Sequence, residues 1–132
     1  MASKNTAKMS QDIVADALNK IINAKKARKT TVELTRYSKL LLSVLAIARL
    51  KDYIKYYAIE NKVLKIEIGN INMCKAIKPR FTVSVSEIEK YEKRYLPAKN
   101  FGIIIISTAK GLMTNQTTQE KNLGGSLIAY FY

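Results

Sequence analysis

The chain has 132 residues, and 48% of them are apolar, so it is long enough to form one medium domain or two small modules with a real core. It carries 23 Lys and Arg but only 10 Asp and Glu, and the resulting net charge of +13 strains a compact fold unless an anionic partner neutralises it. Histidine is absent, which excludes Ser-His-Asp and Cys-His nucleophiles and HExxH zinc sites. These properties favour a nucleic-acid-binding protein over an enzyme.

The cysteine count and the hydropathy pattern indicate where the protein works. Cys74 is the only cysteine, so neither an intrachain disulfide nor a thiolate metal cluster is expected, and a reducing compartment fits best. The longest uncharged stretch, residues 122–132, is well short of the roughly 18 residues that span a bilayer. Residues 1–9 include lysines but no apolar segment, which predicts a flexible extension and not a signal peptide. We therefore expect a cytoplasmic protein.

The first half of the chain alternates between helical and strand patterns. Apolar residues recur every three to four positions over residues 10–23, where Ser10 or Asp12 can cap the helix, and again over residues 38–50. Three strands are predicted from β-branched content and alternation, over residues 30–35, 53–59 and 63–68. The last two strands form a hairpin, in which Asn61 can adopt the left-handed turn conformation.

The second half of the chain is richer in strands. Alternation or continuous apolar character predicts strands over residues 81–85, 101–107 and 127–132. A short helix follows Ser86, which has capping-box spacing to Glu89, and this helix ends before Pro97. One or two helical turns are expected after Thr114.

These elements predict an α+β fold made of two small packed domains. Residues 1–69 form an N-terminal α-β-α-β-β domain, and residues 70–132 form a mainly β C-terminal RNA-binding domain with short helices. Both halves carry an excess of basic residues. Charge spread over folded parts can follow one shaped nucleic-acid surface, which favours RNA.

Three basic segments are candidates for phosphate contacts. One follows the first helix, one begins the second helix, where backbone N–H groups lack partners, and one surrounds a rigid proline. The candidate residues are Lys25, Arg28, Lys29, Ser38, Lys39, Lys78 and Arg80. Each segment also has an ordinary structural interpretation, as a solvated face, a plain N-cap or a simple loop.

Two loops in the second half can reach into an RNA groove. The first follows the most apolar strand and offers hydroxyls, a cation and a flexible glycine, whereas the second contains paired glycines before the last strand. Their residues are Ser107, Thr108, Lys110 and Gly111 in the first loop, and Gly124 and Gly125 in the second. The alternatives are a plain turn for the first loop and a bulge or helix stop for the second.

The sequence contains no recognisable catalytic, metal or cofactor constellation. Glu87 and Glu89 are explained by helix capping, and most of the eight tyrosines fall in helix or strand patterns that predict core positions. We therefore expect no enzymatic activity, no cofactor, no membrane contact and no small-molecule substrate. A DNA-compacting, chromatin-like protein remains the alternative function, and a nucleic-acid-processing enzyme is a third that lacks the usual acid and base groups.

Several motifs, taken together and in order, carry a family resemblance. They are ADALNKI at residues 15–21, AIKPRF at 76–81, YLP at 95–97, STAKGLMT at 107–114, the glycine pair at 124–125 and LIAYFY at 127–132. This series resembles the universal small-subunit ribosomal protein eight family, in its archaeal and eukaryotic form.

The resemblance implies a function and assigns roles to residues. A member of this family binds a hairpin in the central domain of small-subunit ribosomal RNA, beside other small-subunit proteins, and helps the subunit to assemble. Ser107 and Thr108 would then contact an irregular internal loop of the RNA, and Gly111 would permit the turn. Ala109 stands where the family usually has a second serine, and residues 116–119 replace an acidic and alanine-rich stretch.

Overall fold

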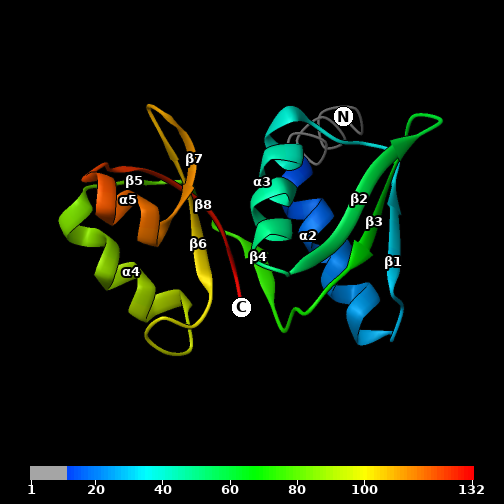
Figure 1. Ribbon diagram of the computed structural model, residues 1–132, viewed down its shortest axis with the longest axis horizontal. Helices are drawn as coiled ribbons and strands as arrows, with labels where there is room; N and C mark the ends of the chain where they lie inside the picture. Colours follow the sequence, from blue (N-terminus) through cyan, green and yellow to red (C-terminus); the bar gives the residue numbers. More distant parts are fainter. Residues whose placement is uncertain (1–11) are drawn as a thin grey trace, which may run out of the picture.

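The computed structural model describes residues 12–132, and its elements form two modules that lie side by side (Figure 1). The first module contains α2 (Ile13–Lys26), β1 (Thr31–Leu34), α3 (Lys39–Leu50), β2 (Ile54–Glu60) and β3 (Val63–Ile68). The second contains β4 (Cys74–Ala76), β5 (Thr82–Val83), η1 (Val85–Glu87), α4 (Ile88–Tyr95), β6 (Ile103–Thr108), β7 (Gly111–Thr114), α5 (Asn115–Lys121) and β8 (Gly125–Phe131). The predicted α+β fold is confirmed.

In the first module, α2 and α3 cover one face of an antiparallel sheet with the strand order β1-β3-β2 (Figure 1). Leu64 and Ile66 of the central strand are fully buried in the core beneath the helices. Asp12 caps α2 by accepting a hydrogen bond of 3.0 Å from the Ala15 N–H group, and Ser38 caps α3 in the same way. The helix starts are therefore fixed by local chemistry that the sequence displays.

The β2–β3 hairpin turns through two left-handed residues. Asn61 has a φ of 51° and Lys62 a φ of 63°. Positive φ at both central residues suits the right-handed twist of the flanking strands. The sequence predicted this conformation for Asn61 only, because a lysine is an unusual choice there.

The second module is built on a sheet with the order β4-β8-β6-β7, to which β5 adds by pairing with β8. Ile104 and Ile106 point into a small core with α4, whereas Ile103, Ile105 and Phe131 join the larger core of the first module. The sheet is thus buried on both faces, and this is why its central strand is an uninterrupted apolar run.

The two modules are joined by close contacts at the end of β8. The Tyr53 ring of the first module stacks on Phe131, with 5.7 Å between the ring centroids. Main-chain hydrogen bonds also link Tyr132 with Met73 in both directions, at 2.9 and 2.8 Å. The last residues of the chain therefore hold the segment that connects the modules.

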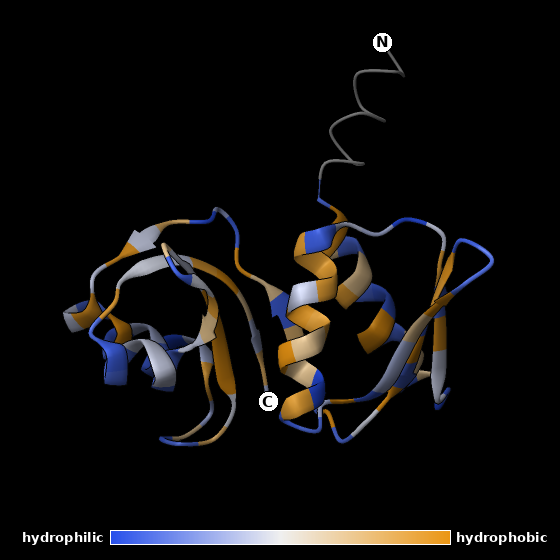
Figure 2. Ribbon diagram, turned by 45° about the horizontal axis from the view of Figure 1, so that its top comes forward, coloured by the Kyte–Doolittle hydropathy of each residue, from blue (hydrophilic) through white to orange (hydrophobic). Residues whose placement is uncertain are grey.

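Hydropathy follows this arrangement. Figure 2 shows hydrophobic colour along the central strands and on the helix faces turned toward them, and hydrophilic colour at the tip of the β2–β3 hairpin. None of the helices within residues 12–132 has the length and apolarity to traverse a lipid bilayer.

Several boundaries differ from the sequence-based prediction. The strand expected over residues 81–85 is only Thr82–Val83, and the capping box is formed by Ser84 and Glu87 instead of Ser86 and Glu89. Strands β4 and β7 were missed, because three or four residues are too few to show a period. Ser10 and the extension over residues 1–9 lie outside the described residues. The domain boundary at residue 69 stays a prediction.

Candidate nucleic-acid interface

The β6–β7 hairpin carries the first predicted loop at its tip. Thr108 pairs with Gly111, so Ala109 and Lys110 are the two turn residues. The Thr108 hydroxyl donates to the Gly111 carbonyl oxygen at 2.8 Å and accepts from the Lys110 N–H group at 3.1 Å. Gly111 has a φ of 111°, a conformation that side chains rarely adopt. The hydroxyl thus fixes the turn and leaves the Lys110 side chain exposed beyond it.

Of the paired glycines, Gly125 lies against the base of this hairpin and Gly124 lies against the end of β5. A Cβ atom on Gly125 would stand 2.2 Å from the Ser107 carbonyl oxygen, and one on Gly124 would stand 2.6 Å from the Val83 carbonyl oxygen. Both glycines are therefore required by close contacts within the protein. They are not the helix stop, because Asn122 ends α5 in the left-handed conformation, with a φ of 56°.

The Lys78-Pro79-Arg80 segment joins β4 to β5. The Lys78 ammonium lies 2.8 Å from the Asp12 carboxylate at the start of α2. Partial burial by itself would raise the pKa of Asp12, but the hydrogen bonds from Lys78 and from the Ala15 N–H group outweigh it and hold this pKa below its usual value. Lys78 is therefore an ion-pair partner within the protein although its side chain is exposed, and Arg80 is exposed as well.

The cations after α2 surround a helix end of unusual geometry. The Lys29 N–H group donates to the Ala24 carbonyl oxygen at 2.9 Å, and the Arg28 N–H group donates to that of Lys25 at 3.0 Å. Arg28 itself is left-handed, with a φ of 62°, at a position that favours glycine. The side chains of Lys25, Arg28 and Lys29 are all exposed.

The candidate residues do not all meet in one place. The β6–β7 hairpin tip and the start of α3, with Ser38 and Lys39, lie at the same end of the molecule, whereas the end of α2 lies at the opposite end (Figure 1). Strand β7 and α3 are in contact. Ser38 is occupied as an N-cap, its hydroxyl accepting from the Leu41 N–H group at 3.2 Å, and Lys39 is exposed. The structure thus gathers the two predicted loops and separates the α2 cations from them.

An aromatic surface in the second module was not predicted. Its rings form a continuous series across α4 and β8, which we call the aromatic ladder: Phe81, Tyr91, Tyr95, Tyr130, Tyr132 and Phe101. The sequence patterns predicted core positions for most tyrosines, and Tyr91, Tyr95, Tyr130 and Tyr132 do pack against the small core of the second module, each with part of its side chain exposed. The spacing of Tyr91 and Tyr95 on one helix face was a visible signal, but their meeting with β8 depends on tertiary structure.

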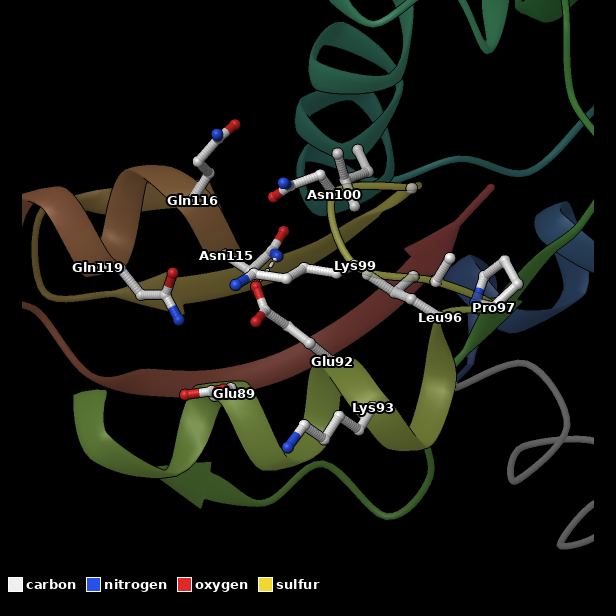
Figure 3. Close-up of a pocket in the computed structure, with 13 residues that line it drawn as sticks. Glu89, Glu92, Lys93, Leu96, Pro97, Lys99, Asn100, Asn115, Gln116 and Gln119 are labelled. Carbon is white, nitrogen blue, oxygen red and sulfur yellow. Dashed lines mark hydrogen bonds between the residues drawn. The ribbon is translucent and has the colours of Figure 1, made fainter.

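A cleft of about 500 Å³ opens between α4, α5 and the loop before β6 (Figure 3). Its polar centre is Asn115, whose side-chain oxygen accepts from the Ile104 N–H group at 3.0 Å and whose amide nitrogen donates to Glu92. Asn115 thereby ties α5 to both β6 and α4. Within the described residues, no group of three or more His, Cys, Asp or Glu side chains could hold a metal ion.

Comparisons with known proteins agree with this architecture. A family model described as ribosomal protein S8 matches residues 12–132. Two proteins named small ribosomal subunit protein uS8, from Nanoarchaeum equitans and Archaeoglobus fulgidus, are each 44% identical to this chain over 129 residues. Each alignment covers 94% of this chain and 100% of the relative, which confirms the resemblance drawn from the motifs. The chain belongs to the ribosomal protein S8 family.

Proposed function

We propose that this protein is a structural constituent of the small ribosomal subunit. It binds a hairpin in the central domain of small-subunit ribosomal RNA, contacts neighbouring small-subunit proteins and helps the subunit to assemble in the cytoplasm. The observation that carries this proposal is the match to the family over the whole described chain, together with the rigid β6–β7 hairpin that packs against Gly125.

The hairpin supplies the shape-selective part of binding. Its turn is already fixed by the Thr108 hydroxyl, so little conformational entropy is lost when RNA docks on it. Lys110 at the tip and Lys39 at the start of α3 lie at the same end of the molecule and reach phosphates on either side of the contact. Backbone and hydroxyl groups near Ser107 read the ribose and base edges.

The cations at the end of α2 supply the part of RNA binding that does not depend on nucleotide sequence. Lys25, Arg28 and Lys29 contact phosphates of a neighbouring RNA segment, and each neutralised phosphate releases counterions. The protein binds the RNA without changing it covalently. RNA incubated with the purified protein and magnesium should therefore keep its length on a denaturing gel.

Co-sedimentation and competition test the proposal. The protein should sediment with small subunits and should bind the central-domain hairpin more tightly than random duplex DNA at equal salt concentration. Equal affinity for both nucleic acids would instead support the chromatin-like alternative, which charge alone favours. Absence of the protein from purified small subunits would overturn the assignment.

A further inference from the structure

The aromatic ladder is an uninterrupted series of ring contacts on the second module. From Phe81 it passes to Tyr91 at 5.3 Å between centroids, to Tyr95 at 6.4 Å and to Tyr130 at 5.2 Å. It continues to Tyr132 at 6.2 Å and ends at Phe101 at 6.3 Å. The four tyrosines and Phe81 are half-buried and pack against the small core of the second module, while Phe101 is 48% exposed, so the ladder lies at the boundary between that core and the surface.

Cations lie over the ladder, and of the nearby carboxylates within the described chain only Glu87, at the start of α4, interacts with one of them, Lys90. The Lys90 ammonium is 5.8 Å from the Tyr91 centroid, and the Arg94 guanidinium is 5.6 Å from that of Tyr95. Glu89 and Glu92 instead line the cleft toward α5, on another side of the helix (Figure 3). The ladder face of α4 is therefore basic and complements an anion.

The tyrosine hydroxyls of the ladder can be compared with the hydrogen bonds of the described chain. Within residues 12–132, the hydroxyls of Tyr91, Tyr95, Tyr130 and Tyr132 make no hydrogen bond to another protein group. Burial, with the neighbouring Tyr132 and Tyr95, raises the pKa of Tyr130 above its ordinary value, which already leaves the hydroxyl protonated at neutral pH. Phenylalanine would serve ring packing equally well, so these groups are free to donate to a partner.

The ladder begins where the hairpin site ends. The Leu127 N–H group donates to the Phe81 carbonyl oxygen at 3.1 Å. Thr82 pairs with Ser126, and Ser126 pairs with Ser107 at the base of the β6–β7 hairpin. The base of the β6–β7 hairpin and the first residue of the ladder are therefore linked through neighbouring strands.

We propose that the aromatic ladder, with Lys90 and Arg94, is a second RNA-contact surface that takes unpaired nucleotides continuing from the structured RNA at the hairpin site. The inference rests on the proposed RNA-binding function. Lys90 and Arg94 contact phosphates, the tyrosine hydroxyls donate to phosphate and ribose oxygens, and the open ring of Phe101 stacks on a base. Duplex RNA keeps its bases inside the helix and cannot use such rings.

Two kinds of RNA separate this surface from the hairpin site. One is the blunt central-domain hairpin, and the other carries a short unpaired extension on its 5′ or 3′ strand. The wild-type protein should bind one of the extended RNAs more tightly than the blunt RNA. Phe101→Ala should reduce that gain about fivefold or more, and Arg94→Gln and Tyr95→Phe should reduce it to a smaller extent. Affinity for the blunt hairpin should not change.

A matched control exists on the other module. Arg49 lies 5.6 Å from the Tyr56 centroid, and Tyr56 is 50% exposed, so this pair has the same chemistry outside the ladder. Arg49→Gln and Tyr56→Ala should leave the gain intact. Thermal unfolding of each variant checks the fold, and Tyr95→Phe keeps the ring contacts in any case.

The outcomes are distinct. If neither extension raises the affinity, or if the ladder variants keep the gain, the proposal is wrong, although the hairpin site stands. If the blunt hairpin itself does not bind, the proposed function fails first. If the variants bind both RNAs normally but enter reconstituted subunits poorly, the ladder docks a protein, and the RNA assignment is overturned.

Discussion

The β6–β7 hairpin and the end of α2 are both candidate RNA contacts, but they differ in how they are held. At the hairpin, the Thr108 hydroxyl closes the turn and Gly125 packs on Ser107, so the geometry is fixed before RNA arrives. At the end of α2, Arg28 and Lys29 are exposed and form no ion pair within the described chain. A fixed tip can select shape, whereas free cations supply attraction alone. Mutations in the hairpin should therefore reduce the selectivity for the RNA, whereas mutations at the end of α2 should reduce only the electrostatic attraction.

The largest effect should come from the contact that holds the hairpin base. Gly125→Ala places a methyl group 2.2 Å from a main-chain oxygen, which backbone movement must relieve. We expect the free energy of unfolding to fall by about 1–3 kcal/mol and the affinity for the RNA hairpin to fall as well. Urea denaturation and RNA titration measure the two losses. Ser126→Ala at the next position adds no volume and is the control. A Gly125→Ala variant with the stability and RNA affinity of the wild type would contradict the close contact between Gly125 and Ser107.

The second largest effect is expected at the turn of the β6–β7 hairpin. Thr108→Ala removes both hydroxyl bonds and should weaken hairpin RNA binding by about 1–2 kcal/mol, because the turn at the tip is no longer fixed. Fold stability should fall by about 1 kcal/mol or less. Thr108→Ser keeps the hydroxyl and should retain most of the affinity. Equal affinity in all three proteins would remove this loop from the site.

Substitutions at the end of α2 should separate the effect of the Arg28 charge on RNA binding from the effect of its left-handed conformation on stability. Arg28→Gly relieves a left-handed residue, so the free energy of unfolding should rise by up to about 1 kcal/mol. The slope of log affinity against log salt should fall by about one, with unchanged preference for the hairpin. Lys29→Ala should reduce the slope equally without stabilising the fold. An unaltered slope in both variants would show that these side chains are only solvated.

The smallest effect is expected at the ion pair between the modules. The pKa of Asp12 is lowered in the folded protein, so its ionised form stabilises the fold. This contribution is complete above the unfolded value of 3.8 and is lost as the pH falls through the lower folded value. The stability difference between wild type and Asp12→Asn should therefore shrink below about pH 4. Urea denaturation across this range measures it, with Asp16→Asn as the control.

Much of the architecture was predictable from residue periods. The helix that contains Leu41, Val44 and Leu45 and the hairpin that contains Leu64 and Ile66 were identified correctly, because burial of one face imposes a period of 3.6 or 2 residues. The site was predictable in part. The loop residues 107–111 and the two glycines do lie together, but the hydroxyl of Thr108 and both glycines turn out to serve contacts inside the protein.

The sequence by itself determined the α+β class, the start of α3 at Ser38 and the basic character, because these depend on neighbours within a few residues or on composition. Only the tertiary structure decided that Phe81, Tyr95 and Tyr130 form one surface and that the α2 cations lie far from the hairpin. Such contacts join residues distant in the chain, and no local period encodes which side chains will meet across a packed sheet.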